Sequence, residues 1–200
     1  MAKGTISTDN YTLGMVDLYY SSTTAHASLT ATDGTILGHG GAFRQTGNLL
    51  GNIVTAGITP DLTYIDHWIS DCGKRKKDKT SLGEVSITIP FTFDEMNAAN
   101  LRKFFVAATD LSKNGVADSN LLAVFESSLE EGSAQLCLTT DVGIDMTYII
   151  PKCTIRPDGA LEMSGEDWWT GPLVIDVLYY ATDHWASKPY GYVIASTIGC

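Results

Sequence analysis

The chain has few charged residues, and basic residues are the scarcer kind. Lys and Arg total 13 of the 200 residues, against 23 Asp and Glu, and charged side chains make up 18% of the sequence. A typical soluble domain is about 25% charged, so the net charge of −10 reflects a shortage of bases. This balance argues against a protein that coats nucleic acid with its general surface or docks on an anionic membrane.

Long apolar runs and targeting segments are also missing. No uncharged apolar stretch approaches the ~18 residues that a membrane-spanning helix needs, so we expect no membrane anchor. The first residues, MAKGTISTDNYT, contain one Lys with no apolar segment behind it, so no secretory signal is visible. We therefore expect a soluble protein made in a cytoplasm.

The four cysteines and four histidines occur at none of the spacings that mark a metal or redox site. The sequence has no C-x-x-C and no H-E-x-x-H motif, so we expect reduced, inert thiols and no metal. Gly38-His39-Gly40-Gly41 is similar to the oxyanion loop of esterases, but the G-x-S-x-G nucleophile motif is missing. We therefore expect no catalytic residue, no cofactor and no enzymatic activity. The histidines are His26, His39, His67 and His184, and the cysteines are Cys72, Cys137, Cys153 and Cys200.

Alternation of apolar and polar residues recurs along the chain and predicts a mainly β protein. The clearest case is SLGEVSITIPFTF, at 81–93, which predicts a strand with one apolar face. Pro90 has no N–H to donate, so we expect it at a sheet edge or a bulge. The segment LVIDVLYY, at 173–180, is apolar on both faces, so both faces need to be covered. Further strands are expected at 11–20, 52–59, 63–70, 135–139, 146–155 and 190–196.

One segment has the period of a helix. Asp94 is the expected N-cap, and the apolar residues that follow it recur at three- and four-residue spacing. We expect a helix at about 95–108 that packs this stripe on a sheet. The segment 120–127 fits either a helix or a strand. No shift in composition marks a boundary, so we expect a single domain over 1–200. The helical stripe consists of Met96, Leu101, Phe104, Phe105 and Ala108.

Two adjacent tryptophans, Trp168 and Trp169, follow Glu166 and Asp167. On a strand, neighbouring side chains point to opposite faces, so at most one of the two indoles would line a sugar-binding platform. Placement of one of them in the core is the favoured interpretation. The tryptophans nevertheless leave an alternative function open, a monomeric ligand- or carbohydrate-binding β-sandwich module.

Basic residues are concentrated in one predicted loop at about 73–80. Five of the 13 lie within six positions and are interrupted only by Asp78, so this stretch carries +4 and the remainder −14. Opposite charges on two surfaces steer association, which makes the loop a candidate contact between subunits. A phosphate-contacting patch and a solvated loop without a partner remain open. The candidate residues are Lys74, Arg75, Lys76, Lys77 and Lys79.

Four stretches of the chain are informative in their order: ITPDLTYIDH, the basic KDKT turn, the alternating strand that runs into TFDEMNAANL, and IPKCTIRPDGALEMSGEDW. In sequence and order, these stretches resemble the major tail tube protein of long-tailed, siphovirus-type bacteriophages. Together with the flanking strands, they cover more than half of the chain in the expected order. The pattern is least evident at 112–145.

The resemblance implies a structural virion protein with a β-sandwich-like tail tube fold and one flanking helix. Six copies would form a hexameric ring, and stacked rings would self-assemble into a hollow tail tube that conducts DNA during ejection. The long hairpin or loop around 73–80 would bridge subunits or rings. The implied partners are further copies of the chain, the tape measure protein, the tail terminator and distal tail proteins. Double-stranded DNA would pass without sequence-specific binding, and the protein would be located in the virion tail after assembly in the host cytoplasm.

Overall fold

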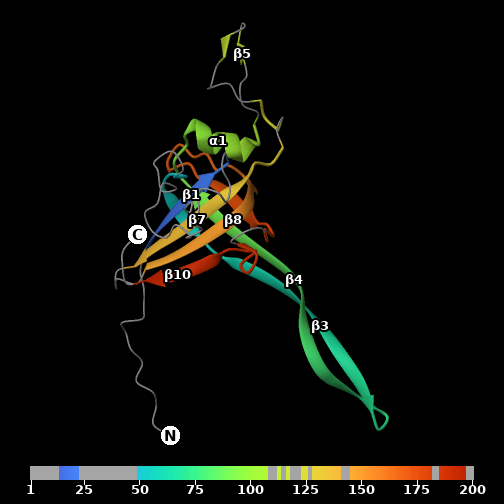
Figure 1. The fold of residues 1–200 in the computed structure, drawn as a ribbon. Coiled ribbons are helices and arrows are strands. Elements are labelled where there is room, and N and C mark those ends of the chain that lie inside the picture. Colours follow the sequence, from blue (N-terminus) through green and yellow to red (C-terminus); the bar gives the residue numbers. More distant parts are fainter. Residues whose placement is uncertain are drawn as a thin grey trace.

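The structure is a computed structural model that describes residues 14–22, 49–107, 112–113, 116–117, 123–125, 128–140, 145–181 and 185–196. The prediction of a mainly β protein with one helix is confirmed for this part of the chain (Figure 1). The helix is α1 (Ala98–Phe105). The strands are β1 (Gly14–Ser21), β2 (Ile53–Ala56), β3 (Thr59–Asp71), β4 (Lys74–Phe93), β5 (Ser112–Lys113), β6 (Val116–Ala117), β7 (Glu131–Thr140), β8 (Asp145–Pro157), β9 (Gly171–Val177) and β10 (Tyr192–Ser196).

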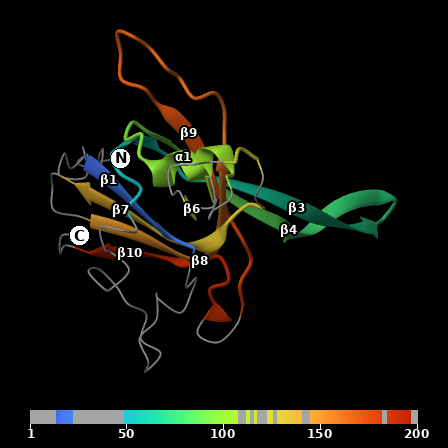
Figure 2. The same cartoon turned by 90° about the horizontal axis from the view of Figure 1, so that it is seen from above.

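Eight strands form one open antiparallel sheet with the order β1-β7-β8-β9-β4-β2, and β10 and β3 branch from β8 and β4. Strand β8 changes its neighbour midway, because Asp145–Ile149 pairs with β10 and Cys153–Pro157 pairs with β9. Pro151 lies between these two stretches, where a residue without an N–H interrupts pairing at little cost. As a result, β1, β7, β8 and β10 run together while β4 and β3 extend to one side (Figure 2).

Each segment predicted as a strand overlaps a strand of the structure, but the bounds of the strands differ from the predicted ones. The segment 63–70 is the middle of a longer strand, β3, and the segment 173–180 ends early, at Val177. Residues 11–13 of the first predicted strand lie outside the described residues. Of the undecided segment 120–127, residues 123–125 are described, and they belong to no named helix or strand.

The main core lies on one face of the sheet, and α1 covers part of it. The alternation predicted for the second half of β4 is confirmed, because Ile89, Phe91 and Phe93 are buried while Pro90 and Thr92 are only partly buried. The core is built from apolar side chains of β1, β4, β7, β8, β9 and α1. Its largest members are Leu18, Tyr20, Ile89, Phe91, Phe93, Phe104, Leu136, Tyr148, Ile150, Ile155, Leu173 and Ile175.

Strand β9 is buried on both faces by the chain itself. Leu173 and Ile175 point into the main core, and Val174, on the opposite face, is only 3% exposed. The expectation that both faces need cover is therefore met within one subunit at this strand. The carboxylate of Asp176 is also satisfied internally, because it accepts a hydrogen bond of 2.6 Å from Arg156 Nε.

Pro90 lies in an interior strand, so the prediction that places it at an edge or a bulge is wrong. Its partner in β9 is Val174, and its carbonyl on the other side accepts from Gly57 N at 3.0 Å. In an antiparallel strand, the N–H and C=O of one residue point toward the same neighbour. The nitrogen of Pro90 therefore faces residues 57–58, which lie between β2 and β3 and belong to neither strand. The lack of an N–H at this position costs no hydrogen bond of the sheet.

The helix is shorter than predicted and begins three residues later. The N-cap is Asn97, whose side-chain oxygen accepts from Asn100 N at 2.9 Å, and the prediction of Asp94 is wrong. The Asp94 carboxylate instead accepts from the side-chain amide of Asn52. The helix ends where Val106 adopts a left-handed conformation with φ 47°. The predicted packing on the sheet is confirmed, because Phe104 is buried in the main core.

Candidate assembly surface

A long hairpin of β3 and β4 projects from the body of the protein (Figures 1 and 2). The two strands pair from Thr59↔Thr88 to Asp71↔Lys74, with register shifts between Thr63 and Tyr64 and between His67 and Trp68. With a rise of about 3.3 Å per residue, the 13 residues of β3 span about 40 Å. We call residues 63–84 the arm. The predicted basic loop at 73–80 is therefore largely a strand, since all of its residues except Gly73 belong to β4.

The end of the arm is a two-residue turn formed by Cys72 and Gly73. Both residues have positive φ, 49° and 76°, which is the signature of the type I′ turn that matches the twist of a hairpin. Glycine adopts this conformation freely, whereas the Cβ of cysteine is disfavoured in it. The thiol of Cys72 is consequently exposed at the extremity of the arm.

Every residue of the arm is exposed, including five large apolar side chains. Their exposed fractions run from 42% for Ile69 to 63% for Ile65. Isolated apolar residues on a surface are ordinary, but a cluster of them on a projecting two-stranded ribbon marks a site of interaction. The five residues are Tyr64, Ile65, Trp68, Ile69 and Leu82.

The register assigns these residues to two faces of the arm. Tyr64 pairs with Leu82, and Trp68 lies on the same side because side chains alternate along a strand. Leu62, two residues before Tyr64, pairs with Val85, and Val85 lies two residues before Ile87, which packs against the main core. This side of the arm, the Trp68 face, therefore continues the face of the sheet that is buried in the main core. The core pattern thus runs outward beyond the point where the chain can cover it. Ile65 and Ile69 lie on the opposite side, the Ile69 face.

The basic residues of the arm are partly neutralised by acids on the facing strand. Lys77 Nζ lies 2.7 Å from Asp66 Oδ1, and Lys76 Nζ lies 2.5 Å from Asp71 Oδ2. Residues 66–79 contain five basic and three acidic side chains, for a net charge of +2. The +4 obtained from the contiguous sequence is therefore too high for the surface that the arm presents.

Three of the five candidate basic residues form no salt bridge within the described residues. They are Lys74, Arg75 and Lys79. The guanidinium of Arg75 lies over the Trp68 ring, 5.9 Å from its centroid. The structure thus divides the candidate set into two lysines that pair with acids across the hairpin and three cations without such a pair among the described residues.

The ion pairs perturb the two carboxylates in the same direction. The hydrogen bond from Lys77, followed by that from Thr80, holds the pKa of Asp66 below its ordinary value. The hydrogen bond from Lys76, with a smaller effect from the Cys72 thiol, lowers the pKa of Asp71. Both carboxylates therefore keep their charge under all but strongly acidic conditions.

Of the four histidines singled out from the sequence, His67 is the one inside the described residues, and its Nδ1 lies 2.6 Å from Asp78 Oδ1.

A second exposed element is the loop 158–170 between β8 and β9, which we call the acidic loop. It contains four acidic residues and no basic ones. Trp168 and Trp169 lie in this loop, not on a strand, and are 86% and 47% exposed. The interpretation that places one of them in the core is wrong. The tryptophan of the described residues that is buried is Trp185, against Ile149.

Local hydrogen bonds shape the acidic loop. Ser164 Oγ accepts from the backbone N–H groups of Glu166 and Asp167, at 3.0 and 3.1 Å. The indole N–H of Trp169 donates to Ser164 O at 2.8 Å and fixes this ring, whereas Trp168 is largely exposed. At the base of the loop lies an open hollow of about 320 Å³. Its lining consists of Thr92, Gly159, Ala160, Glu162, Thr170 and Pro172.

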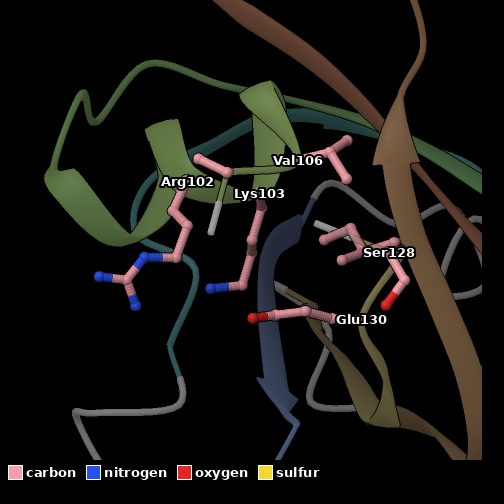
Figure 3. A pocket seen from close by; sticks show the side chains of 7 residues that line it. Arg102, Lys103, Val106, Ser128 and Glu130 are labelled. Carbon is pink, nitrogen blue, oxygen red and sulfur yellow. The ribbon is translucent and has the colours of Figure 1, made fainter. Parts of the chain in front are cut away.

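A smaller cavity beside α1 has room for about one water molecule, at about 10 Å³. Figure 3 shows the side chains of Lys103 and Glu130 pointing into it. Burial lowers the pKa of Lys103, and Glu130 opposes this effect. The pockets that bind small organic ligands start at about 300 Å³, so this cavity accommodates no substrate of that size.

The other residues singled out from the sequence are not brought together. Within the described residues, no group of three His, Cys, Asp or Glu side chains could hold a metal ion. Cys137 and Cys153 are buried thiols that form no disulfide bond within the described residues, and burial raises the pKa of Cys153. Three histidines, the glycine-rich segment at 38–41 and the last cysteine lie outside the described residues. These residues are His26, His39, His184 and Cys200.

In the part of the chain that the structure describes, no helix is long and apolar enough to cross a membrane. Comparison with known proteins found no family model that matches the chain and no curated protein with significant similarity to it.

Proposed function

We propose that this chain is the repeating subunit of a phage tail tube. In this proposal it has a β-sandwich-like tail tube fold, and six copies form a ring. Stacked rings build the hollow channel through which double-stranded DNA passes during ejection. The observation that carries the proposal is the arm, the outer part of a hairpin about 40 Å long, with exposed apolar side chains on both faces.

The physical argument is that an isolated subunit leaves the arm without cover. A two-stranded ribbon is marginally stable in water on its own, and its edges and apolar side chains invite association with other chains. Assembly buries these side chains against neighbours. Since each subunit has one arm and contacts a different surface of the next, the contact is head to tail, and it closes into a ring or continues into a tube.

The charge distribution is compatible with passage of DNA. The chain carries a net charge of −10, and its unpaired arm cations are few. Each phosphate that pairs with Lys or Arg adds affinity and therefore drag, so a channel lined by acids or neutral residues lets DNA slide. Arm cations that face a neighbouring subunit are kept away from the channel. The tape measure, terminator and distal tail proteins are partners that this proposal carries with it.

Electron microscopy of the purified protein and of purified tails tests the proposal directly. The expected result is six-fold rings or hollow tubes, with this chain identified as their subunit by mass spectrometry. A chain that sediments as a monomer at every concentration tested, and that is absent from tail particles, contradicts the proposal.

A monomeric carbohydrate-binding module is the second candidate, because Trp168 is exposed beside carboxylates and an open hollow lies at the base of its loop. An exposed indole is a platform on which a sugar ring stacks. Titration of the monomer with a panel of oligosaccharides, followed by calorimetry, distinguishes the two candidates. Saturable binding that Trp168→Ala abolishes supports the module. If the monomer shows no heat change with any oligosaccharide and the same preparation forms tubes, the result supports the tube subunit.

A further inference from the structure

We infer that the Trp68 face of the arm of one subunit docks on the acidic loop of a second copy. This inference rests on the proposed function and names the surface that the arm contacts. The arm and the acidic loop project from the body in directions that differ from each other, so the arm of a subunit does not cover its own acidic loop (Figure 2). The pairing therefore requires two copies.

The charges of the two elements are complementary. The end of the arm carries +2, with Arg75 free of salt bridges within the described residues. The acidic loop carries −4, from Asp158, Glu162, Glu166 and Asp167. A guanidinium forms two parallel hydrogen bonds with a carboxylate, which gives both orientation and strength. Two like elements repel each other, so the charges also select against arm-to-arm contact.

The arm also presents a large side chain of a size that fits a hollow beside the acidic loop. Tryptophan and arginine are the residues that most often dominate the binding energy of an interface, and on the arm Arg75 lies over Trp68. The hollow of about 320 Å³ at the base of the acidic loop has room for a large side chain, and Glu162 is part of its lining. If Trp68 enters this hollow, the Arg75 guanidinium that lies over its ring comes close to the carboxylates of the loop. Trp168 supplies further exposed apolar surface to the contact.

Cysteine crosslinking in assembled particles tests the inference, because Cys72 is exposed at the end of the arm. Gly165→Cys places a thiol in the acidic loop, and Gly57→Cys places one at the base of β3. At both positions an added Cβ meets no atom within 4 Å, so the two variants are matched controls for folding. All variants carry Cys200→Ser, so that the last cysteine cannot react. The thiols are crosslinked with a short bismaleimide.

The expected result is a crosslinked ladder of subunits for Gly165→Cys, lost when Cys72→Ser is added, and at most a faint dimer for Gly57→Cys. Tubes that form but crosslink no better in Gly165→Cys than in Gly57→Cys overturn the inference and leave the proposed function standing. Absence of rings and tubes from the unmodified chain overturns the proposed function itself.

A charge exchange gives a second readout. Arg75→Glu, on the Trp68 face, is expected to raise the concentration needed for assembly at least about tenfold. Adding Glu166→Lys and Asp167→Lys to the same chain is expected to restore most of the loss, because the pairing is reversed in sign and still complementary. Failure of this triple variant to assemble better than Arg75→Glu alone, with both monomers folded, contradicts the pairing.

Discussion

The Arg75 guanidinium and the Trp68 indole lie on the same face of the arm, with the Arg75 carbon 5.9 Å from the ring centroid. Both residues belong to a ribbon whose every residue is exposed. A cation held over an aromatic ring contributes about 0.5–1 kcal/mol at such a site, which is small beside the apolar area that the pair leaves uncovered. The pair is therefore better suited to an interface than to the stability of the isolated subunit.

Replacement of Trp68 separates assembly from stability. Trp68→Ser is expected to abolish rings and tubes, while the melting temperature of the monomer changes little because the side chain belongs to neither hydrophobic cluster of the described residues. Ile69→Ser, on the opposite face of the arm, is the matched control and is expected to assemble better than Trp68→Ser. Negative-stain images and circular dichroism melts of the same preparations check both parts. Loss of monomer stability in Trp68→Ser equal to that of a core substitution contradicts this picture.

The five basic residues of the arm are expected to behave as two groups. Lys76→Gln with Lys77→Gln removes the partners of Asp71 and Asp66, so it is expected to loosen the hairpin and speed amide exchange in residues 66–79. Arg75→Gln leaves these pairs intact, so exchange in the monomer stays unchanged while assembly becomes weaker and less sensitive to salt. Hydrogen exchange by mass spectrometry and light scattering at two salt concentrations make the comparison. Identical behaviour of the two variants in both measurements contradicts the division.

The observed N-cap of α1 predicts a measurable loss of stability. Asn97→Ala removes the side-chain acceptor of Asn100 N, which typically costs about 1 kcal/mol. Asn97→Asp keeps an acceptor at the same place and is expected to retain the stability of the native chain. Asp94→Ala, at the position favoured by sequence alone, removes instead a contact with Asn52. Urea unfolding followed by circular dichroism gives the three free energies, and equal stabilities of the native chain and Asn97→Ala argue against the cap.

Burial of tyrosines predicts sensitivity to alkali. Burial raises the pKa of Tyr148 to about 12, whereas in an unfolded chain a tyrosine titrates near 10, with roughly one unit of variation. Above pH 10 the unfolded chain loses this proton and the folded chain keeps it, so the free energy of unfolding falls as pH rises toward 12. The contribution is complete below pH 10.

Tyr148→Phe is the variant that tests this dependence. It loses the hydrogen bond to Tyr190 O, 2.8 Å long, which lowers stability at pH 8 by about 1 kcal/mol. It is also expected to show a shallower decline of melting temperature between pH 10 and 11.5. Parallel declines in the native chain and the variant rule out a role for Tyr148 in the alkaline transition.

Strand positions were predictable from sequence because side-chain alternation is a local property of an extended chain. The pattern at Val85, Ile87 and Ile89 identified both a strand and the face that is buried. The same reasoning failed for Trp168, because the rule that neighbours point to opposite faces holds only on a strand and the tryptophan lies in a loop. It also failed for Asp94, since several side chains near a helix start can act as caps and tertiary contacts choose among them.

By itself, the sequence determined that this is a charge-poor, mainly β chain with one helix near residue 100 and a cluster of bases ahead of residue 80. Composition and side-chain alternation are properties of short stretches, so they need no knowledge of what lies opposite. Only the tertiary structure decided that the cluster lies on an exposed arm, that Asp66 and Asp71 neutralise two of its lysines, and that Trp68 shares a face with Arg75. These relationships depend on the register between β3 and β4, and register is fixed by pairing across the hairpin and by the turn at Cys72 and Gly73.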